Sequence, residues 1–301
     1  MMRSPRFFAV ACRRPDNEII IQEEPVESYL GKLAWLNKPF IRGTLALIDS
    51  MIMGIKALTF SANIAMEEPE QEASEGSEKP KVETAEEPVK KPSQSINDIA
   101  VGASLFLGLG LGVVLFVFIP QLLTGLLGKL IHKSFLLNLT EGLVRIVFFL
   151  AYIYSISLLK DIRRVFEYHG AEHKVINTFE SGLDLVPENF AKFTTIHPRC
   201  GTSFITAVLL ISIVVYSCVG WHAIWYIRIA QRLLLLPVIA GIGYELIRFA
   251  GKHRDSKLFT AFVYPGLLLQ KLTTRPPSDD QVEVALAALQ AVMKKEEEAG
   301  A

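Results

Sequence analysis

Long apolar runs dominate the chain from residue 99 onward. Each run has 21 to 23 residues, so as a helix rising about 1.5 Å per residue it can cross roughly 30 Å of hydrocarbon. The runs are residues 99–119, 137–159, 204–225 and 229–249. They predict a mainly α fold: a polytopic helical membrane protein with about four transmembrane helices, in a domain covering residues 96–277.

Residues 39–66 are also apolar, but they carry a polar stripe. Arg42, Asp49, Lys56 and Asn63 recur every seven residues, a step of nearly two helical turns, so they share one helix face. The segment is predicted to be an amphipathic helix that is either interfacial or re-entrant, with a helix that spans the membrane as the open alternative. Its stripe is either solvated or turned toward other helices of a functional site.

The N-terminal segment, residues 1–38, has a different pattern. Two short β-prone runs within residues 6–24 flank Pro15, Asp16 and Asn17, which are turn-forming residues. This predicts a small β-hairpin. Because a two-stranded ribbon is unstable alone, we expect it to pack on another segment on the same side of the membrane.

Two acidic segments interrupt and end the apolar pattern. Residues 67–95 carry nine Glu and four Lys without an aromatic residue, which is typical of a disordered linker. Residues 278–301 carry six acids and two Lys, and Val282, Leu286 and Leu289 recur there at helical spacing. The second segment is therefore predicted to be an acidic amphipathic tail helix.

Composition agrees with a membrane protein. Of 301 residues, 50% are hydrophobic and 21% charged, and the mean hydropathy is +0.33. The formal net charge is zero, which argues against a basic nucleic-acid-binding protein, so the expected partners are the lipid bilayer and other membrane proteins. The three cysteines form no C-x-x-C pair, so neither a disulfide framework nor a zinc ribbon is predicted.

The cationic residues predict the orientation. Lys and Arg are concentrated in residues 1–38, 160–203 and 250–277, and such loops face the cytosol. Both termini and the helical loop 160–203 are therefore predicted to be cytosolic.

The loop 160–203 carries the candidate chemistry. His169, Glu172 and His173 form an H-x-x-E-H motif, and on a helix the two His residues share one face with Glu172 beside it. Two imidazoles at this spacing can hold one divalent ion, with the carboxylate as general base. The motif has the reversed order of the zincin motif.

Three further residues of the loop can complete a metal site. Glu180 is seven residues beyond His173, and His197 and Cys200 directly precede the third apolar run. Zinc accepts all of these donor types, so zinc is the expected metal. The alternative is structural: the imidazoles hydrogen-bond the hairpin or lipid phosphates, and Cys200 is a small buried residue.

Four blocks of sequence together resemble one known family. The blocks MMRSPRFF, PFIRGTLALIDSMIMGIKAL, EYHGAEHKVINTFE and HPRCGTSF are similar to the YqhQ-like family of bacterial membrane proteins. That family is a domain of unknown function labelled a predicted metal-dependent enzyme. The resemblance extends to His169, Glu172, His173, His197 and Cys200, and to Arg42 and Lys56 of the stripe.

The same resemblance implies a bacterial inner membrane. Family members usually carry a Gly-rich stretch before the segment that matches Met2 to Pro5, whereas this sequence begins at that segment. We therefore expect a piece of the N-terminal segment to be missing.

Three functions fit these observations. The leading hypothesis is a metal-dependent hydrolase with its site at the cytosolic membrane face. The alternative is a non-enzymatic scaffold or accessory factor in membrane-protein assembly, motivated by the amphipathic helix and the acidic segments. A transporter comes third, because charged residues in the spans are few and lie near the span ends.

Overall fold

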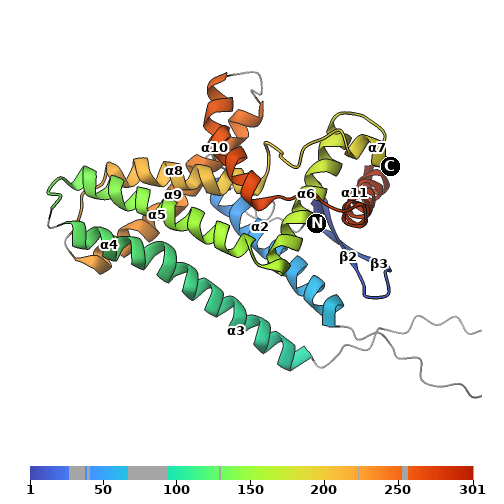
Figure 1. Ribbon diagram of the computed structural model, residues 1–301, viewed down its shortest axis with the longest axis horizontal. Helices are drawn as coiled ribbons and strands as arrows, with labels where there is room; N and C mark the ends of the chain where they lie inside the picture. The colour runs from blue at the N-terminus through green and yellow to red at the C-terminus, as the bar shows by residue number, and fades with distance from the viewer. Residues whose placement is uncertain are drawn as a thin grey trace, which may run out of the picture.

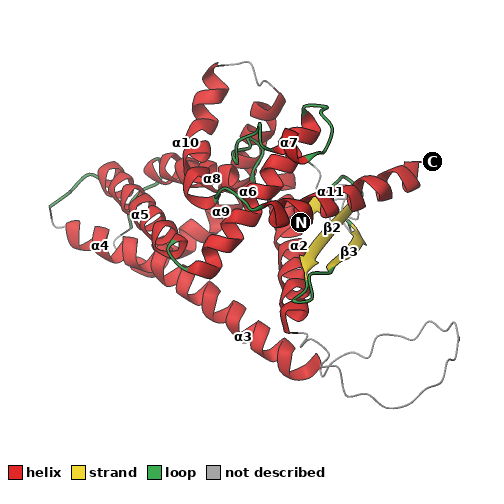
Figure 2. Cartoon of the chain, turned by 45° about the vertical axis from the view of Figure 1, so that its right-hand side comes forward, coloured by secondary structure: helices red, strands yellow, loops and turns green. Residues whose placement is uncertain are grey.

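The computed structural model describes residues 1–26, 38, 41–66, 94–128, 130–222, 224–252 and 257–300. Helices dominate, and a three-stranded antiparallel sheet lies near the N-terminus (Figure 2). The predicted mainly α membrane fold is confirmed. Nearly all of the predicted linker lies outside the described residues, which resume at Gln94.

The sheet contains the predicted hairpin and one more strand. Strands β2 (Phe7–Arg13) and β3 (Ile19–Pro25) pair antiparallel. In the turn between them Asn17 has φ 71°, a conformation that Asn tolerates better than most residues. The short strand β1 (Met2–Arg3) pairs with the other edge of β2.

The two faces of the sheet are covered by two different helices. Alternate side chains of a strand point to opposite faces. Ala9 packs with Met2 against helix α11 (Asp279–Gly300). Phe8 and Val10 pack instead against Met53 of helix α2 (Ile41–Met66).

The tail helix α11 is therefore part of a globular module rather than a free end. Its buried face, including Val282 and Leu289, packs on α6 (Lys160–Glu180), and α7 (Pro187–Phe190) adds Phe190 to the same core. Arg6 donates to the carboxylate of Glu296 and to backbone carbonyls at the end of α11. Figure 1 shows this module at one end of the molecule.

The remaining helices form an elongated bundle beside the globular module (Figure 1). Within the described residues, four segments are long and apolar enough to cross a membrane, as expected of a membrane protein. The spanning candidates are Ile41–Ala65, Gly102–Leu127, Ser134–Ser157 and Trp225–Phe249. The helices of this part are α3 (Gln94–Val113), η2 (Val114–Phe118), α4 (Ile119–Leu127), α5 (Ser134–Ser157), α8 (Gly201–Ser217), α9 (Trp225–Lys252) and α10 (Lys257–Thr273).

Two helices differ from the predicted spans. The span expected at 204–225 is the 17-residue helix α8, which ends at Ser217. It stops there because the chain turns after Cys218, where Asn138 donates to the carbonyl of Val219 at 2.8 Å. The segment expected to be interfacial or re-entrant is one unbroken helix, α2, and it is one of the four candidates for crossing a membrane among the described residues.

The polar stripe of α2 joins the bundle to the sheet. Arg42 forms two hydrogen bonds with Glu245 of α9, at 2.6 and 2.5 Å, and Lys56 pairs with Glu24 of β3 at 2.7 Å. Asp49 is buried, whereas Asn63 is exposed. Three of the four stripe residues thus have a protein partner or lie buried, although Lys56 is also exposed.

A proline explains the π-helical segment before α4. Pro120 has no N–H and cannot bond the carbonyl of Phe116, four residues earlier. The backbone widens to the π-helix η2 at this point. The freed carbonyl of Phe116 accepts a hydrogen bond from Arg145 Nε of α5 at 3.1 Å.

The same arginine belongs to a buried charge network inside the bundle. Glu141 of α5 is 1% exposed and accepts hydrogen bonds from Arg145 at 2.7 Å and Arg232 at 2.5 Å. Arg232 also donates to Asn138 at 3.2 Å and lies 4.5 Å from the ring centre of Tyr216. Nothing in the sequence pattern indicated Arg232 as the partner of Glu141, which lies 91 positions earlier.

Candidate metal centre

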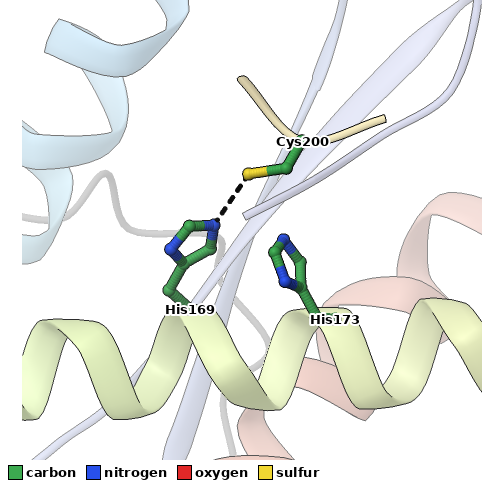
Figure 3. A group of neighbouring side chains, drawn as sticks. All are labelled: His169, His173 and Cys200. Carbon is green, nitrogen blue, oxygen red and sulfur yellow. Dashed lines mark hydrogen bonds between the residues drawn. The ribbon is translucent and has the colours of Figure 1, made fainter. Parts of the chain in front are cut away.

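The two histidines of the H-x-x-E-H motif project from one face of α6. This helix ends where Gly182 adopts φ 72°, the left-handed conformation of a glycine that follows a helix C-terminus. Figure 3 shows both rings rising from α6 toward the sulfur of Cys200, which is the N-cap residue of α8. The site therefore lies where the globular module meets the bundle.

Backbone carbonyls orient both imidazoles. His169 Nδ1 lies 2.9 Å from the carbonyl of Thr273, and His173 Nδ1 lies 2.6 Å from that of Thr195. A carbonyl only accepts, so both Nδ1 atoms carry the proton and donate it. The Nε2 atoms are left to face Cys200, and a carbonyl partner of this kind is what metal-binding histidines usually have.

The three side chains meet at one point. His169 Nε2 lies 3.2 Å from Cys200 Sγ, and the ligand atoms of His169, His173 and Cys200 all lie within 4.8 Å of one another. Tetrahedral zinc with bonds of about 2.0–2.3 Å needs ligand atoms roughly 3.5 Å apart. A small closing movement therefore satisfies two nitrogens and one sulfur, a donor set that suits zinc.

Close packing around Gly170 holds this arrangement. A Cβ at Gly170 would lie 2.1 Å from the carbonyl oxygen of Arg275. The backbone N–H of Arg275 donates to the carbonyl of Phe166 at 2.9 Å, one turn earlier on α6. The chain after α10 can lie flat on α6 and bring the carbonyl of Thr273 to His169 only because residue 170 has no side chain.

The charges of the three groups favour a thiolate. Burial raises the pKa of the Cys200 thiol, but hydrogen bonds from His169 and His173 outweigh burial and lower this pKa from 9.0 to about 5. Burial lowers the pKa of His169, yet its hydrogen bond and charge interaction with Cys200 leave that pKa raised overall. Without metal, the Cys200 thiolate forms an ion pair with the His169 imidazolium. A metal cation that binds both groups displaces the imidazolium proton.

This electrostatic arrangement predicts an unusual pH profile for Cys200. In metal-free protein carrying Cys12→Ser and Cys218→Ser, iodoacetamide should alkylate Cys200 with a midpoint near pH 5. As the pH falls, Cys200 stays a thiolate until the pH reaches its lowered pKa. Below that pH the thiol is protonated and its reactivity is lost. Adding His169→Ala should move the midpoint upward, and a midpoint near 9 in the parent protein would contradict this electrostatic account.

The other residues predicted for the site lie around this cluster. His197 is 5% exposed, with its ring centre 5.8 Å from that of His173, and it is the nearest further donor. Its Nε2 lies 3.4 Å from Glu180 Oε1 but makes no hydrogen bond among the described residues. Burial lowers the pKa of His197, although Glu180 acts in the opposite direction.

Both candidate carboxylates have other partners. Glu180 pairs with Arg199 as well as facing His197. Glu172 lies on the neighbouring face of α6 and binds the backbone nitrogen of Met1. The structure thus brings together His169, His173 and Cys200, places His197 beside them, and holds Glu180 and Glu172 at the periphery.

Sequence reasoning missed the residues that support the cluster. Gln270 of α10 is completely buried, accepts from the backbone N–H of His197 at 2.8 Å and donates to its carbonyl at 2.9 Å. Thr202 donates its hydroxyl to Cys200 Sγ at 3.3 Å. Only Thr202 had a signal in the sequence, its position two residues after Cys200; Gln270 is distant in sequence and lies in an ordinary apolar run.

Comparison with known proteins gives a family. The family model described as "Protein of unknown function (DUF1385)" matches residues 38–295, which is most of the chain. The chain belongs to the DUF1385 family. It is also 35% identical over 305 aligned residues to the Uncharacterized protein YqhQ of Bacillus subtilis (strain 168), covering 98% of this chain and 90% of that protein.

The match confirms the resemblance to the YqhQ-like family. The matched residues 38–295 include the whole bundle and the cluster of His169, His173 and Cys200. No solved structure matches the chain.

Proposed function

We propose that the protein is a metal-dependent hydrolase of the bacterial inner membrane, with a zinc-type ion held by His169, His173 and Cys200. One observation carries the proposal: both imidazoles are fixed by backbone carbonyls through Nδ1 and turn their remaining nitrogens toward one thiolate. Three protein ligands leave a fourth position for substrate, as in catalytic rather than structural zinc sites.

The protein's own residues have separate roles in this proposal. A bound zinc ion would supply Lewis acidity toward a carbonyl or phosphoryl oxygen. The carbonyls of Thr273 and Thr195 orient the ligands, and Thr202 donates to the sulfur. Glu172 is proposed as general base, a role that requires its carboxylate to leave Met1, and His197 as a partner of bound substrate.

The proposal includes a topology. The globular module and the metal centre lie together at one end of the bundle, and residues 1–26 and 160–203, which belong to the cation-rich segments, lie at that end. We place this end in the cytosol, with a multi-pass bundle and both termini on the cytosolic side.

Metal content tests the ligand set directly. Wild type, His173→Ala and Cys200→Ser are purified without a polyhistidine tag, loaded with zinc, desalted and analysed by elemental mass spectrometry. Wild type should retain close to one zinc per chain, and each variant at least tenfold less, because a lost ligand weakens a three-ligand site severely.

An exposed histidine supplies the matched control. His132 lies in the connection before α5, away from the cluster, so His132→Ala should retain as much zinc as wild type. Equal zinc in wild type and in correctly folded His173→Ala would contradict the proposed ligand set.

A further inference from the structure

A second feature adjoins the cluster on the side of the bundle. A cavity of about 630 Å³ lies between α2, the start of α8 and the second half of α9, and Cys200 is one of its lining residues. This volume falls within the range of about 300–1,000 Å³ that small-molecule sites occupy. The thiolate of the candidate metal centre is therefore part of the wall of a ligand-sized space.

The crossing of α2 over α9 creates this cavity. At Gly43 a Cβ would lie 2.7 Å from Tyr244 Cβ and 2.9 Å from Gly241 Cα. The absence of a side chain at Gly43 permits this close approach of the two helices, and the Arg42–Glu245 ion pair joins them beside it. Residues of α2, of the start of α8 and of α9 line the cavity next to this contact.

The lining has two chemical characters. Leu47, Phe204, Ile205 and Ile247 are among the apolar residues of the wall. Leu47 is 39% exposed and Ile205 is 47% exposed, so the apolar part reaches the outer surface of the bundle. A cavity that opens through leucine and isoleucine on helices of this kind opens toward lipid.

The charged residues of the lining are cations. Arg199 and Arg248 contribute to the wall, and no Asp or Glu of the described residues does. Arg199 forms an ion pair with Glu180. Arg248 is exposed and makes no hydrogen bond or ion pair within the described part of the chain. Arg248 is thus available to an anionic group, which arginine binds well through its paired N–H donors.

We infer that this cavity binds an anionic phospholipid, with its phosphate at Arg248 and Arg199 and the adjoining acyl chain along Leu47, Phe204 and Ile205. The apolar mouth excludes a freely soluble anion as the preferred ligand, because such a ligand leaves the apolar wall uncovered. The headgroup region of the lipid then lies next to Cys200. Naming the lipid as the substrate class rests on the proposed function; the binding itself does not.

Binding is measured with the full-length protein, delipidated in detergent and titrated with fluorescent phosphatidylglycerol. The matched ligand is fluorescent phosphatidylcholine, which has a phosphate but no net charge. Phosphatidylglycerol should bind saturably and at least about tenfold more tightly than phosphatidylcholine, and excess inorganic phosphate should not displace it.

Three variants locate the site. Arg248→Gln should weaken phosphatidylglycerol binding about tenfold, as loss of a charge-assisted contact does. Ala46→Trp should abolish it by filling the cavity, whose wall includes Ala46. Arg163→Gln, on α6 and paired with Glu167, should bind as wild type does.

The outcomes separate the two proposals. Equal affinity for both lipids, or wild-type binding by both Arg248→Gln and Ala46→Trp, would overturn the lipid site, as would displacement by inorganic phosphate. His173→Ala should lose zinc and keep phosphatidylglycerol binding. If instead His173→Ala retains zinc while Arg248→Gln loses the lipid, the proposed metal centre fails and the lipid site stands.

Discussion

Glu141→Gln is expected to lower the free energy of unfolding by about 3–5 kcal/mol, because it leaves two buried guanidinium groups without their counter-charge. Glu141 is 1% exposed and Arg232 is 8% exposed. Of the described residues, Glu141 is the carboxylate within ion-pair distance of both Arg145 and Arg232. In a bundle surrounded by lipid, water cannot replace it at low cost.

Equilibrium unfolding in mixed micelles measures this loss. The matched control is Glu188→Gln, which removes the same charge from an exposed position of α7 and should change the stability by no more than about 0.5 kcal/mol. Replacing the whole network by apolar residues, as Glu141→Leu with Arg145→Met and Arg232→Met, should recover much of the loss. A Glu141→Gln protein as stable as the control would show that the network contributes little.

Gly170→Ala is expected to destabilise the protein by about 1–3 kcal/mol, the usual cost of forcing atoms into a packed site. The added Cβ would lie 2.1 Å from the carbonyl oxygen of Arg275 and 3.1 Å from Thr195 Cγ2. Backbone atoms cannot rotate away as a side chain can. The segments carrying both atoms must move, and these are the segments that supply the carbonyls bound to His169 and His173.

The same substitution should therefore weaken zinc binding by about 10–100-fold, the usual effect of losing the partners of metal ligands. Thermal unfolding and zinc titration are measured on one preparation. The matched control is Gly54→Ala on α2, where the added Cβ meets nothing within 4 Å and should stabilise the helix by about 0.5–1 kcal/mol. Unchanged zinc affinity in Gly170→Ala would show that the carbonyls do not orient the imidazoles.

The predictable parts of the molecule depend on short-range geometry. The turn at Asn17 and the flanking β-prone runs were sufficient to predict the hairpin, and the four-residue spacing placed His169 and His173 on one helix face. These features need only the periods of helices and strands and the preferences of turn residues. The third strand, β1, has two residues, too few to leave a periodic signal.

What the sequence could not show is which partners compete for a side chain. Glu180 stands at helical spacing from His173, yet its carboxylate pairs with Arg199. Arg232 is buried against Glu141, a pairing that the sequence does not indicate. Such pairings depend on how helices distant in sequence cross, and one sequence carries no direct record of that.

The helix boundaries show the same limit. Hydropathy extended the third apolar run to residue 225, because Trp221 and Ile224 count as apolar, although the helix ends at Ser217. Hydropathy measures transfer to lipid and does not register where a backbone turns. Hydropathy likewise does not reveal what pairs with the polar stripe of α2, where Arg42 pairs with Glu245 and Lys56 with Glu24.

The pairing of the first strands with the last helix also determines when the globular module can form during synthesis. Arg6 bonds to Glu296, 290 positions later in the chain. A ribosome adds residues in order, so strands β1 to β3 are made first and must wait until α11 has been released and the bundle helices between them have entered the membrane. The module can therefore form only after α11 has been synthesised, and contacts between such distant parts of a chain form slowly.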